Sequence, residues 1–363
     1  MSAVNRTNEP NGWERALIPL RRDAFREKVL SNVDRYLALS EQQSLTVGFY
    51  RRGEWYVFGN HAPDAALMYD IGSISKTVTA HLILRLVEEG RLELSRRVSD
   101  YLELTGDGYP TLYELLTHTA GYGHLTPATV TVPALFRHGY ARKNIYDGCT
   151  AKTVLRCLSV NRGKRGAGYS YSDFPYAILA VVAERVTGIP FADLLEDFVQ
   201  NDLNMKHTVI TLPPEDRQPK AMQGRRVLRY WHWERSNPYI AGGGLVSNAR
   251  DMLTYLTLQI ESEAGYITAA HRLCQASLSE KRNLAMCIGW HTYKKSNQLW
   301  HVGGVGTFRS SIVLNKKRGI GVVVLGNSKG IASANVHYLA KMLYSEMKIK
   351  KIRFDRTEEF VDK

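Results

Sequence analysis

Strand-forming patterns occur only near the two ends of this chain, and the long stretch between them is mostly helical. Near the N-terminus, two strands are predicted over 44–50 and 54–59, joined at Arg51-Arg52-Gly53. Near the C-terminus, strands are predicted over 284–293, 298–302, 307–315 and 320–327. We therefore expect an α+β fold in which both ends build one antiparallel sheet and an α-rich lobe is inserted between them.

The helical middle and the two ends are expected to form one domain. With 363 residues, of which 44% are hydrophobic, the chain is long enough for one large core or two packed lobes. We expect this domain over 20–348, with an α/β lobe from 20–72 and 284–348, a mostly helical lobe from 73–283, and tails at 1–19 and 349–363. Periodicity predicts helices over 23–39, 73–92, 111–117, 174–187, 190–203 and 332–347.

The segment Ser73-Ile74-Ser75-Lys76 begins the longest predicted helix and places a hydroxyl group near an ammonium group. Residues three apart share a helix face, and a helix N-terminus adds positive potential, so Lys76 can lie beside the Ser73 hydroxyl. This arrangement can make an acyl-accepting nucleophile without a histidine base. The spacing alone is not specific, because Ser345 and Lys348 repeat it in a predicted terminal helix, where we interpret both as a solvated face.

Two further polar segments follow in the chain, Tyr171-Ser172-Asp173 and His301-Val302-Gly303-Gly304. Together with Ser73-x-x-Lys76, in this order and at these separations, they resemble the motifs of the serine β-lactamase and penicillin-binding-protein superfamily. The resemblance is to the branch that includes class C β-lactamases, D-amino-acid peptidases and related esterases. Residues 115–121 (LLTHTAG) and 241–247 (AGGGLVS) look like the same branch. The resemblance covers about 25–348 and implies a β-lactamase/transpeptidase-like fold.

The resemblance also implies how the proton of Ser73 is removed. It makes Tyr171 the candidate base and Lys76 its electrostatic partner. Neither is a good base at neutral pH with an unperturbed pKa of about 10, but a nearby ammonium favours tyrosinate and burial favours neutral lysine. Which of the two holds the proton at rest stays open. His301 replaces the lysine of many β-lactamases, and we expect it to titrate near physiological pH and to donate to a substrate carboxylate or to Tyr171.

Substrate-binding roles are implied for Gly303, Gly304 and Asp173. The resemblance assigns the oxyanion to the backbone N–H groups of Ser73 and Gly304, where glycine lets the substrate come close. Asp173 stands where the family usually has asparagine, so a carboxylate that only accepts hydrogen bonds replaces an amide. Its charge would hold Lys76 protonated and repel an acidic substrate. This change favours neutral or amine-bearing substrates, such as esters or peptides with a free D-amino N-terminus.

We therefore predict a serine hydrolase that cleaves an ester or amide of a small molecule or peptide through a Ser73 acyl-enzyme. The alternatives are acyl transfer to an amine or alcohol, a D-amino-acid peptidase, or a penicillin- or acyl-ligand-binding protein without turnover. No cofactor and no metal are expected, because no spacing is typical of a metal site. His118 is expected to hold a loop near the nucleophile, and His124, His232 and His291 to be within reach of a cleft.

The formal net charge of +13 is concentrated over 217–235 and 348–356. Neither stretch carries a nucleic-acid-binding motif, so we expect a solvated surface or a wall that attracts an anionic substrate. Residues 1–19 lack an apolar leader region, and no run approaches a membrane span. We expect a cytoplasmic protein that binds an acyl substrate but no nucleic acid and no membrane; its oligomeric state is not predictable. Free thiols are expected at Cys149, Cys157, Cys274 and Cys287.

Overall fold

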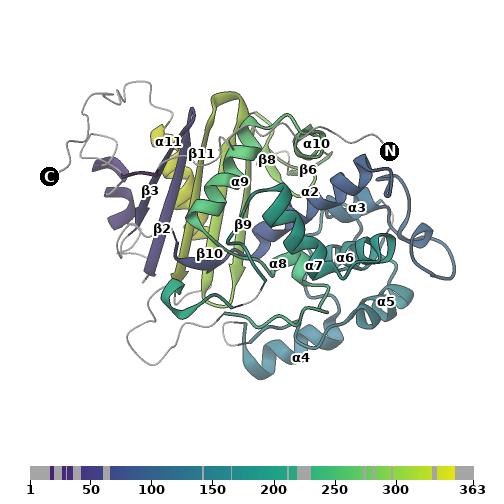
Figure 1. The fold of residues 1–363 in the computed structure, drawn as a ribbon. Helices are drawn as coiled ribbons and strands as arrows, with labels where there is room; N and C mark the ends of the chain where they lie inside the picture. The colour runs from purple at the N-terminus through teal and green to yellow at the C-terminus, as the bar shows by residue number, and fades with distance from the viewer. Residues whose placement is uncertain are drawn as a thin grey trace.

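The sheet joins the two ends of the chain (Figure 1). The structure, a computed structural model, describes residues 17–19, 27–29, 31–35, 42–59, 66–140, 143–164, 166–210, 212–218, 230–272, 275–279, 283–295, 297–328 and 333–347. Within them, nine strands form one sheet in the order β1-β3-β2-β11-β10-β9-β8-β7-β6. The predicted sheet is confirmed, because β2 from one end pairs antiparallel with β11 from the other. The strands are β1 (Leu17–Pro19), β2 (Gln42–Arg51), β3 (Glu54–Gly59), β6 (Gln275–Ser279), β7 (Leu284–Met286), β8 (His291–Tyr293), β9 (Gln298–Val305), β10 (Phe308–Asn315) and β11 (Ile320–Ser328).

Two strand predictions need correction. Residues 1–19 were expected to be a tail, but β1 lies within them and pairs in parallel with β3. The predicted strand over 284–293 is a hairpin of β7 and β8, because the chain turns near Gly289, whose φ of +74° suits glycine. A second, two-stranded sheet joins β4 (Met68–Asp70) to β5 (Val246–Asn248), just before the Ser73 segment.

Most predicted helices are present. Helix α6 has the predicted bounds, whereas α2 is shorter than predicted, because Ser73 lies in a 3-10 turn, η1 (Gly72–Ile74), that precedes it. Helices α4, α5, α8 and α10 lie where no helix was predicted, and residues 27–29 and 31–35 are helical within the predicted 23–39. The labelled helices are α2 (Ser75–Glu88), α3 (Leu112–Leu116), α4 (Ala128–His138), α5 (Ala151–Val160), α6 (Phe174–Thr187), α7 (Phe191–Asp197), α8 (Ile240–Gly243), α9 (Ala249–Glu261), α10 (Gly265–Arg272) and α11 (Ser333–Met347).

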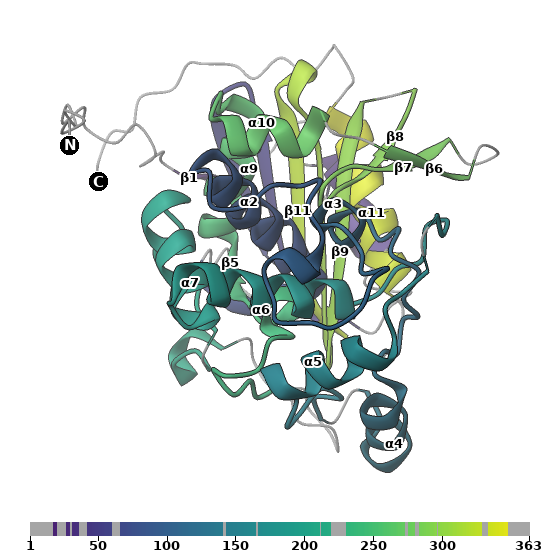
Figure 2. The same ribbon diagram turned by 90° about the vertical axis from the view of Figure 1, so that its right-hand side faces the viewer.

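Hydrophobic cores lie on both faces of the sheet. Successive strand residues point to opposite faces, so Val323 and Leu325 of β11 join a large core with the helical lobe, whereas Val322 and Val324 join a smaller core with α11. Figures 1 and 2 show α2, α6 and α9 on one side of the sheet and α11 on the other. The larger core packs the helical lobe against the sheet, and two of the polar motifs lie at the N-terminal ends of α2 and α6.

Cysteine pairing differs from the prediction. Cys149 and Cys157 are free, but Cys287 is disulfide-bonded, and its partner is not among the residues described. The expectation of four free thiols is therefore wrong for Cys287. A disulfide is typical of an oxidising compartment, so it counts against the cytoplasmic expectation.

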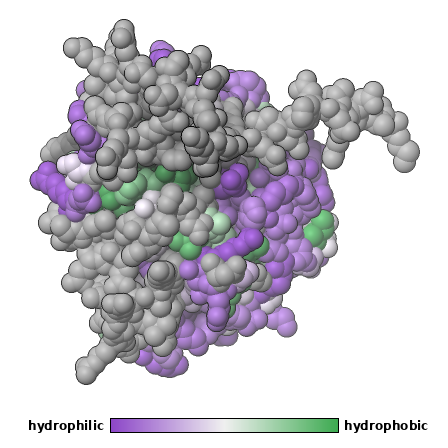
Figure 3. Space-filling view, turned by 60° about the vertical axis from the view of Figure 1, so that its left-hand side comes forward, coloured by the Kyte–Doolittle hydropathy of each residue, from purple (hydrophilic) through white to green (hydrophobic). Residues whose placement is uncertain are grey.

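The surface offers few further constraints. No helix in the described part of the chain is long and apolar enough to cross a membrane. Hydrophilic residues cover most of the described surface in Figure 3. The stretch 348–356 and most of 217–235 lie outside the described residues, but Arg235 forms ion pairs with Asp193 at 2.5 Å and Glu196 at 2.7 Å. The charge of Arg235 is thus compensated by carboxylates of the protein itself.

Candidate active site

Ser73 lies in the tight turn η1, between β4 and α2. The Ile71 N–H donates to the Leu245 carbonyl at 3.0 Å, which ties the turn to the segment before β5. Gly72 has a φ of +51°, and a Cβ there would lie 2.6 Å from the Gly304 nitrogen. Only glycine permits this approach, which places Ser73 next to β9.

Lys76 is fully buried and forms the centre of the polar site. Its Nζ donates to Ser73 Oγ at 3.0 Å, to the Gly242 carbonyl at 2.7 Å and to Asp173 Oδ1. An ammonium group has three donors, so these acceptors use all of them. Because Lys76 donates to Ser73 Oγ, the proton of the serine hydroxyl is left free for another acceptor, and the Tyr171 oxygen is close enough for Ser73 to lower the pKa of Tyr171.

Asp173 immediately precedes α6 and holds Lys76 from the opposite side of Ser73. The Tyr146 hydroxyl donates to its other oxygen, Oδ2, at 2.5 Å. Burial opposes ionisation of Asp173, but the Lys76 ammonium and the Tyr146 hydrogen bond hold its pKa below the usual range. Burial lowers the pKa of Lys76, and the Asp173 charge counteracts that shift. As an ion pair of a carboxylate and an ammonium, Asp173 and Lys76 together carry no net charge.

The Tyr171 ring lies against the same ammonium, with Lys76 Nζ 5.0 Å from the ring centroid. Burial and then the Asp173 charge raise the pKa of Tyr171 well above its ordinary value, although Ser73 counteracts this shift. Tyr171 is consequently a neutral phenol at rest. The His118 ring packs 4.5 Å from it, and His118 Nδ1 accepts the Ser172 N–H at 3.4 Å, in line with the predicted loop-holding role.

His301 is completely buried, and its ring centroid lies 6.3 Å from that of Tyr171. Its Nδ1 donates to the Val302 carbonyl at 2.8 Å, so in the neutral ring Nε2 is an acceptor. Burial and then the neighbouring His291 and Lys76 lower the pKa of His301 well below its usual value. The expectation that His301 titrates near physiological pH is therefore wrong. Neutral His301 has already used its one N–H and cannot donate it to Tyr171.

Gly303 and Gly304 bring β9 against the nucleophile turn. A Cβ on Gly303 would lie 2.0 Å from the Ile71 carbonyl oxygen. The two-residue turn after Val305 makes Val305 and Phe308 a hydrogen-bonded pair, so the next pair, Gly304 with Arg309, is a non-hydrogen-bonded one. The N–H and carbonyl of Gly304 therefore point away from β10. The Gly304 N–H is free of the ladder, as an oxyanion donor beside Ser73 must be.

A small aromatic pocket opens at this point. It is narrow, with free space of about 20 Å³, roughly enough for one water molecule. Its lining combines the polar site with rings from three separate segments: Ser73, Tyr140, Tyr146, Asp173, Trp231, Trp233, Tyr239, Gly242, Gly243, Gly304 and Val305. The pocket thus presents the serine hydroxyl and the Gly304 backbone to a small ligand.

The structure brings every predicted site residue to one region, but sequence reasoning missed several partners. Tyr146 and Tyr140 carry no motif, and they come from a segment without clear periodicity. Gly242 lies in the glycine-rich segment 241–247, where the pattern gives no sign that a carbonyl accepts from lysine.

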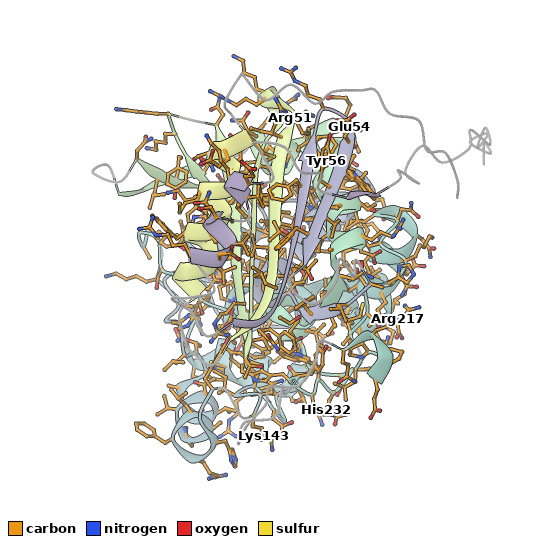
Figure 4. The ribbon with its side chains drawn as sticks, turned by 90° about the vertical axis from the view of Figure 1, so that its left-hand side faces the viewer. Arg51, Glu54, Tyr56, Lys143, Arg217 and His232 are labelled. Atoms are coloured by element: carbon orange, nitrogen blue, oxygen red, sulfur yellow. The ribbon has the colours of Figure 1, made fainter. Side chains whose placement is uncertain are left out.

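The other histidines that the structure describes lie in separate surroundings. The rings of His124 and His291 lie 5.8 and 6.3 Å from the Tyr171 ring, whereas His232 is exposed and pairs with Glu234 at 2.8 Å. Figure 4 shows His232 and Lys143 near one end of the molecule, far from the labelled Arg51. No group of three or more metal-ligating side chains occurs within the described ranges.

Comparison with known proteins agrees with these motifs. A family model described as Beta-lactamase matches residues 31–344. Protein flp of Staphylococcus aureus strain MW2 is 24% identical over 294 residues, which are 76% of this chain and 54% of that protein. A protein named Beta-lactamase from Providencia stuartii is 29% identical over 205 residues, 54% of this chain and 47% of that protein. The chain thus spans about half the length of these curated relatives.

Solved structures show the same fold. An octameric penicillin-binding protein homologue from Pyrococcus abyssi has a TM-score of 0.70 at 22% identity, covering 88% of this chain and 76% of that one. A class C beta-lactamase has a TM-score of 0.72 at 16% identity, covering 88% of this chain and 96% of that one. These similarities and the matched family model show that the chain belongs to the beta-lactamase family, within the serine β-lactamase and penicillin-binding-protein superfamily.

Proposed function

We propose that this protein is a serine hydrolase that cleaves an ester or amide of a small molecule or peptide through an acyl-enzyme on Ser73. The observation that carries the proposal is the hydrogen bond from Lys76 Nζ to Ser73 Oγ, with the Tyr171 ring packed against the same ammonium at the edge of a pocket. Such an arrangement places a hydroxyl nucleophile near a group that can accept its proton.

Acylation begins when Ser73 Oγ attacks the substrate carbonyl carbon. Before this attack, Tyr171 loses its proton to solvent, and the Lys76 ammonium stabilises the tyrosinate. As Oγ attacks, its proton passes to the tyrosinate oxygen, so the rate should rise with pH. The oxyanion accepts from the N–H groups of Ser73 and Gly304, and loss of one such donor typically costs about 2.7–4 kcal/mol of barrier.

The same groups complete the cycle. The Tyr171 hydroxyl returns the proton to the departing alcohol or amine, and the carbonyl–oxygen or carbonyl–nitrogen bond breaks. Water then attacks the acyl-enzyme, gives its proton to the pair and releases the acid with free Ser73. An alcohol or amine in place of water would make the protein an acyltransferase by the same steps.

The charge of the site supports a substrate preference. With asparagine at position 173, Lys76 would give the site a charge of +1, whereas the Asp173–Lys76 pair is neutral. A unit charge ~7 Å from a substrate carboxylate is worth about 2 kcal/mol at an effective dielectric constant of about 20. Loss of this attraction disfavours acidic substrates by roughly 30-fold. Neutral or amine-bearing acyl groups are therefore preferred.

A second candidate is a penicillin- or acyl-ligand-binding protein that deacylates slowly. The observation in its favour is the burial of Tyr171 beside the Asp173 charge, which raises its pKa well above the ordinary value and so disfavours the tyrosinate that would activate water. The names of the Providencia relative and the Pyrococcus homologue suggest β-lactam ligands for those proteins. Rapid acylation followed by no turnover would favour this candidate over a hydrolase.

The proposal is tested with p-nitrophenyl esters of three six-carbon acyl chains that end in a methyl, an ammonium or a carboxylate group. We expect kcat/KM for the neutral and cationic esters to exceed that for the anionic ester by at least tenfold. Ser73→Ala should abolish all three activities after subtraction of spontaneous hydrolysis. Hydrolysis that survives Ser73→Ala would overturn the proposed nucleophile, and a preference for the carboxylate ester would overturn the charge argument.

A further inference from the structure

Part of the edge of β9 near the nucleophile has no neighbouring strand, but side chains of the protein already bond to its carbonyl groups. Strand β8 pairs with β9 only from Gln298 to Trp300, so beyond Trp300 this edge has no strand partner in the described part of the chain. The alternation of pairs with β10 turns the carbonyls of Val302 and Gly304 toward this edge. A substrate chain could add to such an edge through its own N–H groups.

Side chains of the protein cover both of these carbonyls. His301 Nδ1 donates to the Val302 carbonyl at 2.8 Å. The Tyr140 hydroxyl donates to the Gly304 carbonyl. The Gly304 carbonyl is the more informative of the two, because it belongs to the residue whose N–H is assigned to the oxyanion. A substrate bound there has its acyl group beside this carbonyl.

Tyr140 is fixed in this position by the pocket wall. Its ring packs edge-on against Trp231, with centroids 4.8 Å apart. Its own backbone carbonyl accepts the Trp231 Nε1–H at 3.1 Å. Burial and then the Asp173 charge raise the pKa of Tyr140, so its hydroxyl stays protonated and remains a donor.

We propose that Tyr140 is a specificity-determining residue that occupies the Gly304 carbonyl and so selects acyl groups without an adjacent N–H. An acylamino group, as in a peptide or a penicillin, needs an acceptor for its N–H, whereas a hydrocarbon acyl chain does not. The N–H bearing ligand must displace the Tyr140 hydroxyl and leave it without its partner, which removes the advantage of the new hydrogen bond. This inference rests on the proposed function, since it assumes that the acyl group is bound at Ser73.

Two boronic acids that add reversibly to a serine hydroxyl test the proposal directly. Acetamidomethylboronic acid carries the N–H, and 3-oxobutylboronic acid has CH₂ in its place. In the wild-type protein we expect their dissociation constants to agree within about twofold. In Tyr140→Phe the N–H ligand should bind about 3- to 10-fold more tightly than its CH₂ analogue, because one hydrogen bond usually contributes this much to affinity.

Tyr109→Phe is the matched control. The Tyr109 hydroxyl also donates to a backbone carbonyl, that of Thr105 at 3.0 Å, but Tyr109 does not line the pocket. This variant should keep the wild-type ratio of the two dissociation constants. An unchanged ratio in Tyr140→Phe would overturn the inference.

The wild-type measurement keeps the proposal open to refutation if Tyr140→Phe does not fold. If the wild-type protein binds the N–H ligand 3- to 10-fold more tightly than its analogue, the Gly304 carbonyl is available to accept the ligand N–H. That result would overturn the inference. Failure of the proposed function gives a different result, because then neither boronic acid would bind in a Ser73-dependent way, and the inference would fall with it.

Discussion

Replacement of Asp173 by asparagine should activate the candidate nucleophile near neutral pH. The Lys76 ammonium donates to Asp173, Ser73 and Gly242, and only the first of these acceptors carries a charge. Two unit charges ~4 Å apart interact by about 4 kcal/mol at an effective dielectric constant of about 20. Each 1.36 kcal/mol corresponds to one pKa unit, so loss of the carboxylate should lower the pKa of Lys76 by about 2 to 3.

The pKa of Tyr171 should fall in the same variant, because the Asp173 charge raises it. The rising limb of the pH–rate profile for acylation should then move to lower pH by about 2, and acylation at pH 7 should accelerate roughly 10- to 100-fold. The net charge of the pair at positions 76 and 173 changes from zero to +1 while Lys76 remains protonated, so the preference against the carboxylate ester should also shrink. Single-turnover acylation by p-nitrophenyl hexanoate between pH 5.5 and 10 measures both effects.

Two controls accompany Asp173→Asn. Asp193→Asn removes an exposed carboxylate that pairs with Arg235 and should leave the profile unchanged. Because removal of one partner from a buried ion pair can cost about 3–5 kcal/mol, urea unfolding must show that the variant is folded at assay temperature. A folded Asp173→Asn protein whose rising limb stays in place would refute the electrostatic account of Lys76 and Tyr171.

Three further predictions concern stability and local geometry. Lys76→Met should lower the free energy of unfolding by about 3–5 kcal/mol because it leaves Asp173 buried without its countercharge. Adding Asp173→Asn should recover part of this loss, as measured by urea unfolding. If the effects of the two substitutions on the unfolding free energy simply add, the pairing is contradicted. Burial and neighbouring His337 and Lys76 lower the pKa of His291 from 6.5 to about 3, so its contribution is present above pH 6.5 and is lost as the pH falls toward 3. We expect a loss of about 2 kcal/mol from His291 by pH 5, and His291→Gln should flatten the decline in unfolding free energy between pH 7.5 and 5; an equally steep decline would contradict this assignment. Gly303→Ala would place a Cβ 2.0 Å from a backbone oxygen, so acylation should fall at least 100-fold, and near wild-type acylation would contradict the close approach.

The sequence predicted best those features that depend on local patterns. The bounds of α6 follow from a continuous apolar run between the Tyr171 turn and Gly188, which caps the helix in the left-handed conformation. The pairing of both chain ends was also predictable, because isolated terminal strands need partners. By contrast, α4 was missed, since its residues include two threonines and Pro133, which are poor helix formers.

Parts of the site that depend on tertiary contact could not be predicted. That the Asp173 charge acts on Lys76 was predicted only through the family resemblance, because these residues are 97 positions apart and neither the motif spacing nor the charge pattern fixes the geometry of their ion pair. The low pKa of His301 results from complete burial, which a strand pattern of alternating residues does not quantify. Tyr140 reaches Gly304 across 164 positions from a segment without a motif.

The central claim is that Ser73 accepts an acyl group from a substrate. Intact-protein mass spectrometry after brief exposure to p-nitrophenyl butyrate, a fluorophosphonate and a penicillin tests it directly, with wild-type protein and Ser73→Ala treated in parallel. The account predicts an added mass on Ser73 with the butyrate ester and the fluorophosphonate, weaker labelling by the penicillin, and none in Ser73→Ala. Unlabelled wild-type protein, or labelling that persists in Ser73→Ala, would contradict it.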